Sequence, residues 1–100
     1  MDYLAAMRAF VRSVELGSFS KAADEGGLKD STVSRYVSGL EAVLGAALLN
    51  RSTRSLHLTE AGRLFYDRAA QILADVEDAR SATASLNERP RLAAGTSWRT

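Results

Sequence analysis

Glycines divide the first 45 residues of this 100-residue chain into three segments that are too short to fold alone. Gly17, the pair Gly26-Gly27 and Gly45 each follow a stretch in which apolar residues recur every three or four positions. That spacing places the apolar residues on one face of an α-helix, and a glycine just past the last turn commonly ends a helix. The sequence therefore predicts three short helices that must bury their apolar faces against one another.

The first helix is expected over residues 3–16 and the second directly after Ser18, whose hydroxyl can cap it. The third helix is opened by the polar stretch 29–32. Each helix has an apolar inner face at helical spacing, made of Leu4, Met7, Phe10, Val11 and Val14 in the first, Phe19, Ala22 and Ala23 in the second, and Val33, Val37, Leu40 and Leu44 in the third. The three faces together predict one small helical core.

Residues 48–58 change to a different pattern. An apolar pair, a polar basic tip and an alternating return segment predict a short β-hairpin. Thr59 then caps a long helix, with Glu60 well placed near its N-terminal dipole. Pro90 stops that helix at or before Arg89, and residues 90–100 are expected to be a hinge or tail.

A regular apolar stripe runs along the long helix in alternating steps of four and three. Its members are Phe65, Ala69, Ile72, Val76, Ala79, Thr83 and Leu86. This is the heptad seam of a coiled coil, so we expect the helix to pair with its copy in a second chain. The alternative is that the stripe packs against its own domain, but a helix of this length exceeds a small domain's core.

Composition excludes several classes of function. The chain has no cysteine and one histidine, which rules out a disulfide framework, a thiolate zinc site and a metal site built on His57. The absence of cysteine fits a reducing cytosol. No apolar run is long enough for a membrane span or a signal peptide. Paired carboxylates, a nucleophile–base pair and a phosphate loop are also missing, so we expect neither an enzyme nor a cofactor.

The segment from Ser18 to Val37 carries the constraints of a helix-turn-helix. Ala23 is small enough to let the second helix approach the third, and Gly27 suits a turn that needs positive φ. Leu28 and Val33 are expected to fill the angle between the two helices. Followed by a basic hairpin, this layout predicts a mainly α fold, a winged helix-turn-helix with a long helix after it.

At this point the sequence resembles the N-terminal domain of the LysR-type bacterial transcriptional regulators. The resemblance runs from Met1 to about Leu86 and rests on the blocks GSFSKAA, VSR..SGLE..LG and LTEAG. It implies a DNA-binding domain over residues 1–58, a dimerisation helix over 59–89, and transcriptional control in the bacterial cytoplasm. It also implies a C-terminal domain that binds a small-molecule effector. That domain is absent here, so we expect the chain to be a truncated or natural fragment; tetramers are common in the family.

The resemblance and the helix pattern agree on which residues meet double-stranded DNA. The third helix is the recognition helix, and Arg35 is the strongest base reader because its guanidinium can bind guanine O6 and N7 together. The other candidates for base readout are Asp30, Ser31, Thr32, Ser34 and Tyr36. Contacts to phosphates, or to the minor groove from the wing, are expected from Ser18, Ser20, Lys21, Lys29, Arg51, Ser52, Thr53 and Arg54.

Four positions depart from the family pattern. The family usually has Ser and Gln where this chain has Lys29 and Asp30. Asp30 can accept from cytosine N4, or it can cap the recognition helix, and we favour capping because carboxylates are repelled by DNA. Gly26 replaces a usual leucine, so the second helix should be shorter or looser. Tyr36 replaces a common glutamine and could stack on a sugar or contact a base.

One competing function is kept open. A protein-interaction module could use the same fold and dimerise without reading DNA. Salt distinguishes the two, because binding through Lys/Arg–phosphate contacts weakens steeply as salt rises, whereas binding through apolar surface does not. Arg35 could also be a solvated helix charge, and Arg51 and Arg54 plain surface charges.

Overall fold

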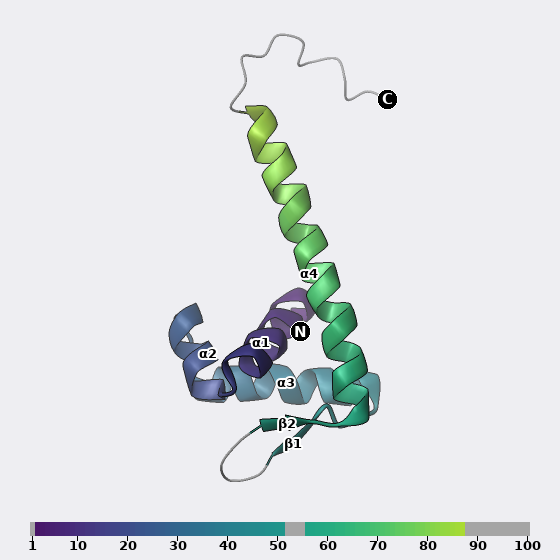
Figure 1. The fold of residues 1–100 in the computed structure, drawn as a ribbon. Helices are drawn as coiled ribbons and strands as arrows, with labels where there is room; N and C mark the ends of the chain where they lie inside the picture. The colour runs from purple at the N-terminus through teal and green to yellow at the C-terminus, as the bar shows by residue number, and fades with distance from the viewer. Residues whose placement is uncertain (1, 52–55, 88–100) are drawn as a thin grey trace.

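Four helices and one hairpin make up the fold of the computed structural model, which describes residues 2–51 and 56–87 (Figure 1). The elements in chain order are α1 (Tyr3–Leu16), α2 (Phe19–Gly26), α3 (Asp30–Leu44), β1 (Leu49–Arg51), β2 (Leu56–Leu58) and α4 (Glu60–Asn87). The predicted class, a winged helix-turn-helix followed by a long helix, is confirmed. Nothing described bears on the predicted hinge or tail at residues 90–100, or on the predicted helix end at Arg89.

Local capping sets the helix ends where the sequence indicated. The Ser18 hydroxyl oxygen accepts a hydrogen bond from the Lys21 N–H at 3.1 Å, which confirms it as the cap of α2. Gly27, just past α2, has φ 69°, a conformation that side chains with a Cβ rarely adopt. Its N–H returns to the last turn of α2, so the chain reverses sharply and enters α3 after two more residues.

The core lies where α1, α3 and the start of α4 meet, and it also receives the first residues of the hairpin. Phe10, Leu40 and Leu48 are its largest fully buried side chains. A second, smaller cluster joins α2 to α3 through Ala22, Ala23 and Val33, as the small residue at position 23 predicted. The two clusters hold α2 and α3 in the helix-turn-helix arrangement.

Two residues expected inside are instead on the surface. Leu44 is 39% exposed, because α3 extends one turn beyond the part of the core that covers Leu40. Leu28 is 42% exposed and does not fill the angle between α2 and α3 as predicted. Its side chain lies over Gly26, where a Cβ would stand 3.7 Å from it.

The hairpin is tied to α3 by one carboxylate. β1 and β2 pair antiparallel, with Leu49 opposite Leu58. Glu41 of α3 accepts hydrogen bonds from the Leu48 and Leu49 N–H groups at 2.8 and 3.3 Å, and from the Arg51 guanidinium at 3.2 Å. Glu41 thus satisfies two backbone donors at the start of the hairpin and sets the position of the hairpin beneath α3 (Figure 1).

Helix α4 begins in close contact with the strand entry, the backbone of Ala47 and Leu48 just before β1. The Thr59 hydroxyl accepts from the Gly62 N–H at 2.9 Å, which confirms the predicted cap, and it donates to the Ala47 carbonyl at 2.6 Å. The Thr59 N–H binds the Leu48 carbonyl at 3.0 Å. Gly62 is buried against that same carbonyl, so the first turn of α4 lies directly on the chain that enters β1.

The first half of α4 packs on its own domain, whereas the predicted dimer seam stays a prediction. The Phe65 ring lies 5.7 Å from the Phe10 ring, centroid to centroid, and Ala69 is fully buried in the main core. These two residues pack inside their own domain, because α1 crosses the start of α4. Further along, α4 extends away from the other helices (Figure 1), and Ile72 and Leu86 are 46% and 61% exposed. None of the described helices is both long enough and apolar enough to cross a membrane.

A chain of polar contacts links α2, α1 and α4. The Arg12 guanidinium donates to both carboxylate oxygens of Glu25 at 2.7 and 2.5 Å and to Glu15 at 2.5 Å. Glu15 accepts from the Tyr66 hydroxyl at 2.9 Å. The hydrogen bonds from Arg12 hold the pKa of Glu25 below its ordinary value, and the bond to Glu15 raises the pKa of Tyr66.

Candidate nucleic-acid interface

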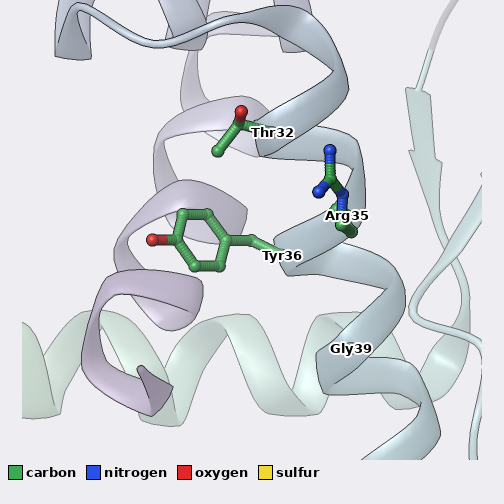
Figure 2. Close-up of a pocket in the computed structure, with 4 residues that line it drawn as sticks. All are labelled: Thr32, Arg35, Tyr36 and Gly39. Atoms are coloured by element: carbon green, nitrogen blue, oxygen red, sulfur yellow. The ribbon is translucent and has the colours of Figure 1, made fainter. Parts of the chain in front are cut away.

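The N-terminal half of α3 presents an open face (Figure 2). Thr32, Arg35, Tyr36 and Gly39 follow one another at helical spacing along this face and line a shallow hollow of about 430 Å³. Val33 and Val37, on the opposite side of the helix, are buried. The helix therefore points its apolar side inward and its candidate base-reading side outward, as the sequence predicted.

Arg35 is the cation at the centre of this face. It is exposed, and within the described parts of the chain no hydrogen bond or ion pair engages its guanidinium. Figure 2 shows it extending along the helix toward Thr32, away from the Tyr36 ring. All five of its N–H donors are thus available to an acceptor outside the protein.

The first turn of α3 differs from the sequence prediction. The capping position is held by Lys29, which makes no side-chain cap hydrogen bond, and Asp30 is the first helical residue. Asp30 therefore does not cap α3 as favoured above, because the turn after Gly27 places it one residue too late. Its carboxylate still lies in the first turn, where the helix dipole stabilises a negative charge. Lys29, Asp30 and Ser31 are exposed, and Ser34 is half-buried.

A second group of candidates lies at the start of α2. Ser20 and Lys21 are exposed, and the Ser18 oxygen is engaged as the cap. The Arg51 guanidinium stands 5.6 Å from the Phe19 ring, which brings β1 beside the first turn of α2. The Arg51 side chain thus links the hairpin to the start of α2, although the two are far apart in the sequence.

Arg51 has partners within the protein. Besides Phe19, it pairs with Glu41, which is the more buried of the two side chains. One of its N–H groups is therefore engaged in holding the hairpin, and its predicted contact to DNA remains a prediction. The other wing candidates, Ser52, Thr53 and Arg54, lie outside the described residues.

Sequence reasoning missed two residues that position the site. The sequence patterns assign Glu41 no role, although its four-step spacing from Val37 places it beside the inner face of α3. Gly62 was seen only as part of the LTEAG block. A glycine in the first turn of a helix, where no positive φ is needed, is the signal of a close backbone approach. Among residues 2–51 and 56–87, no cluster of His, Cys, Asp or Glu could hold a metal ion.

Comparison with known proteins agrees with this geometry. The family model described as bacterial regulatory helix-turn-helix protein, lysR family, matches residues 4–63. The chain belongs to the LysR family. An HTH-type transcriptional regulator of Xanthomonas campestris pv. campestris (strain 8004) is 48% identical over 82 residues, which is 82% of this chain and 24% of the relative. The transcriptional activator AaeR of Escherichia coli (strain K12) is 42% identical over 90% of this chain and 29% of its own length.

Solved LysR-family structures share the fold. The BenM DNA-binding domain, solved in complex with catB site 1 DNA, has a TM-score of 0.82 and 35% identity, covering 91% of this chain and 100% of that one. The CbnR DNA-binding domain, solved with DNA, has a TM-score of 0.70 and 33% identity, covering 85% and 99%. The chain spans between 24% and 29% of the length of the two LysR-family relatives above.

Proposed function

We propose that this LysR-family domain reads a specific sequence of double-stranded DNA, with α3 in the major groove and the hairpin wing at the minor groove. The observation that carries the proposal is the outward face of α3, with an uncommitted Arg35 at its centre. A major groove about 12 Å wide admits one α-helix, and the N-terminal half of α3 presents its open face to the outside. Two structural relatives solved as DNA complexes support the same function.

Each candidate has a role that its chemistry allows. Arg35 binds guanine O6 and N7 as a bidentate donor, and Ser31, Thr32 and Ser34 donate to base edges or phosphates. Ser20, Lys21 and Lys29 meet phosphates, because the free N–H groups at the starts of α2 and α3 attract the same anions. Asp30 accepts from cytosine N4, and Tyr36 packs against a base. The wing contact is assigned to Arg51, Ser52, Thr53 and Arg54.

We also infer that two copies pair through the outer half of α4. The supporting observation is the predicted stripe past the point where α4 leaves the core, in which Val76 is half-buried and the other members are exposed: Ile72, Ala79, Thr83 and Leu86. At 1.5 Å per residue, α4 spans about 42 Å, so half of it can pack against a partner. Two joined domains would place two recognition helices on half-sites about one or more helical turns apart.

The relatives are transcriptional regulators, which suggests a role for the whole protein. We infer that the chain acts within a transcriptional regulator in the bacterial cytoplasm, and that a small-molecule effector acts through a separate C-terminal domain. Because this chain spans only about a quarter of its relatives, these functions belong to the proposal for the whole protein.

Selection of bound duplexes from random DNA, followed by affinity measurement at two salt concentrations, tests the proposal. Recovery of a defined half-site is expected, with log affinity falling by about 0.9 per unit of log salt for each phosphate contact. Recovery of no preferred sequence, or an affinity that ignores salt, would favour the protein-interaction module instead.

A further inference from the structure

The hollow beside the Arg35 guanidinium is mostly apolar, although a cation lies at its edge. Besides Arg35 itself, Thr32, Tyr36 and Gly39 form its wall, and most of the lining surface is apolar. Figure 2 shows the Thr32 methyl group turned to the side on which the Tyr36 ring lies, and both hydroxyl groups turned away from the space between them. The recognition face therefore carries an apolar recess next to its main cation.

Among the groups that base pairs present in the major groove, the 5-methyl of thymine is the only methyl group and the largest apolar one. A carbonyl oxygen or amino group placed against the Thr32 methyl and the Tyr36 ring, out of reach of the Arg35 guanidinium, would lose its hydrogen bonds to water without gaining a partner, which is unfavourable. We propose that the side of the hollow formed by Thr32, Tyr36 and Gly39 receives the methyl group of a thymine, next to the guanine bound by Arg35. This specificity assignment rests on the proposed function and goes beyond it, because it names the base and the residues that recognise it.

Geometry supports the pairing of the two readers. Arg35 and Tyr36 are consecutive residues, so their side chains leave α3 about 100° apart, and one helix can address two neighbouring base pairs with them. Gly39, one turn beyond Arg35, has no side chain to fill the recess. A glycine inside a helix is unfavourable for the helix itself, so its presence here leaves room at a cost in helix propensity.

The test uses the duplex recovered by selection as the probe. Each thymine of the half-site is replaced in turn by deoxyuridine, which removes the 5-methyl group and keeps the base-pairing edge. Burying one methyl group corresponds to about a three- to fivefold change in affinity, so one thymine should show a loss of that size. The other thymines should show little change.

Variants of the recess then locate that methyl group. Thr32→Ser removes one wall methyl and keeps the hydroxyl, so the deoxyuridine effect should shrink. Gly39→Ala adds a methyl to the recess and favours the helix, so the duplex with deoxyuridine should bind as well as, or better than, the duplex with thymine. Val43→Ala is the matched control, because Val43 lies on the same helix, is 64% exposed and does not line the hollow. It should leave the deoxyuridine effect unchanged.

Two results would overturn the assignment. One is a half-site in which no thymine responds to loss of its methyl group. The other is a thymine that responds equally in the unsubstituted protein, Thr32→Ser and Gly39→Ala, since its methyl would then lie elsewhere. A protein that selects no duplex at all would instead refute the proposed DNA binding, so the two failures are distinguishable.

Discussion

Gly62→Ala should destabilise this domain strongly, although alanine is the better helix former. A Cβ built at Gly62 would stand 1.9 Å from the Leu48 carbonyl oxygen and 2.9 Å from its carbon. A relaxed C···O contact is about 3.3 Å, so the first turn of α4 and the strand entry must separate by about 1.4 Å. No flexible side-chain end can absorb that movement, because the obstructing atoms belong to the backbone.

The expected cost follows from what this separation disrupts. Thr59 bonds to the Leu48 and Ala47 carbonyls at 3.0 and 2.6 Å, and both bonds must stretch or break. Each is worth about 1 kcal/mol net, and forced overpacking adds about 1–3 kcal/mol. Helix propensity returns at most about 1 kcal/mol. We expect a net loss of about 2–4 kcal/mol in the free energy of unfolding, or roughly 10–25 °C in Tm for a domain of this size.

Gly26→Ala is the matched control, with the same chemical change and the opposite expected sign. A Cβ at Gly26 would meet only the Leu28 side chain at 3.7 Å, an ordinary contact. Its backbone is helical, so alanine should stabilise by about 0.4–1 kcal/mol. Urea unfolding followed by far-UV circular dichroism, at one fixed protein concentration, measures both variants. Equal shifts for the two, or a Gly62→Ala variant as stable as the parent, would refute the close approach of α4 to Leu48.

Three further predictions concern DNA reading, pairing and pH. Arg35→Ala should weaken binding to the selected duplex by about 1–3 kcal/mol and relax preference at one base pair per half-site; an unchanged preference in a repeat selection would remove Arg35 as a reader. Ile72→Asp combined with Val76→Asp should yield a monomer by light scattering, because like charges repel on a buried seam; a dimer that persisted would show that pairing uses another surface. Because contact with Arg12 lowers the pKa of Glu25, the stability it contributes is present above the ordinary value of 4.5 and is lost as pH falls through the lowered value. Glu25→Gln should therefore lower Tm at pH 7 and leave it nearly unchanged near pH 3; an equal difference at both pH values would contradict the pairing.

The sequence by itself determined the helices, their order and the face of α3 that points outward. These features depend on interactions within a few residues. The Ser18 hydroxyl reaches an N–H three residues away, and Gly27 relieves a local steric limit on φ. The spacing of Val33 and Val37 likewise turns Arg35 outward without reference to the rest of the chain. Because these interactions act within a few residues, the sequence alone predicts these features correctly.

Only the tertiary structure decided which surface each apolar or charged residue meets. One stripe along α4 predicted burial but could not name the partner, and the crossing of α1 assigned Phe65 and Ala69 to their own core. Glu41 holds the hairpin only because the chain returns to α3 seven residues later. Gly62 is required only because a carbonyl from outside its own helix approaches it. The periodicity of apolar residues predicts that one face of a helix is buried. Which residues bury that face depends on how segments distant in the sequence pack together, and a local pattern carries no information about that packing.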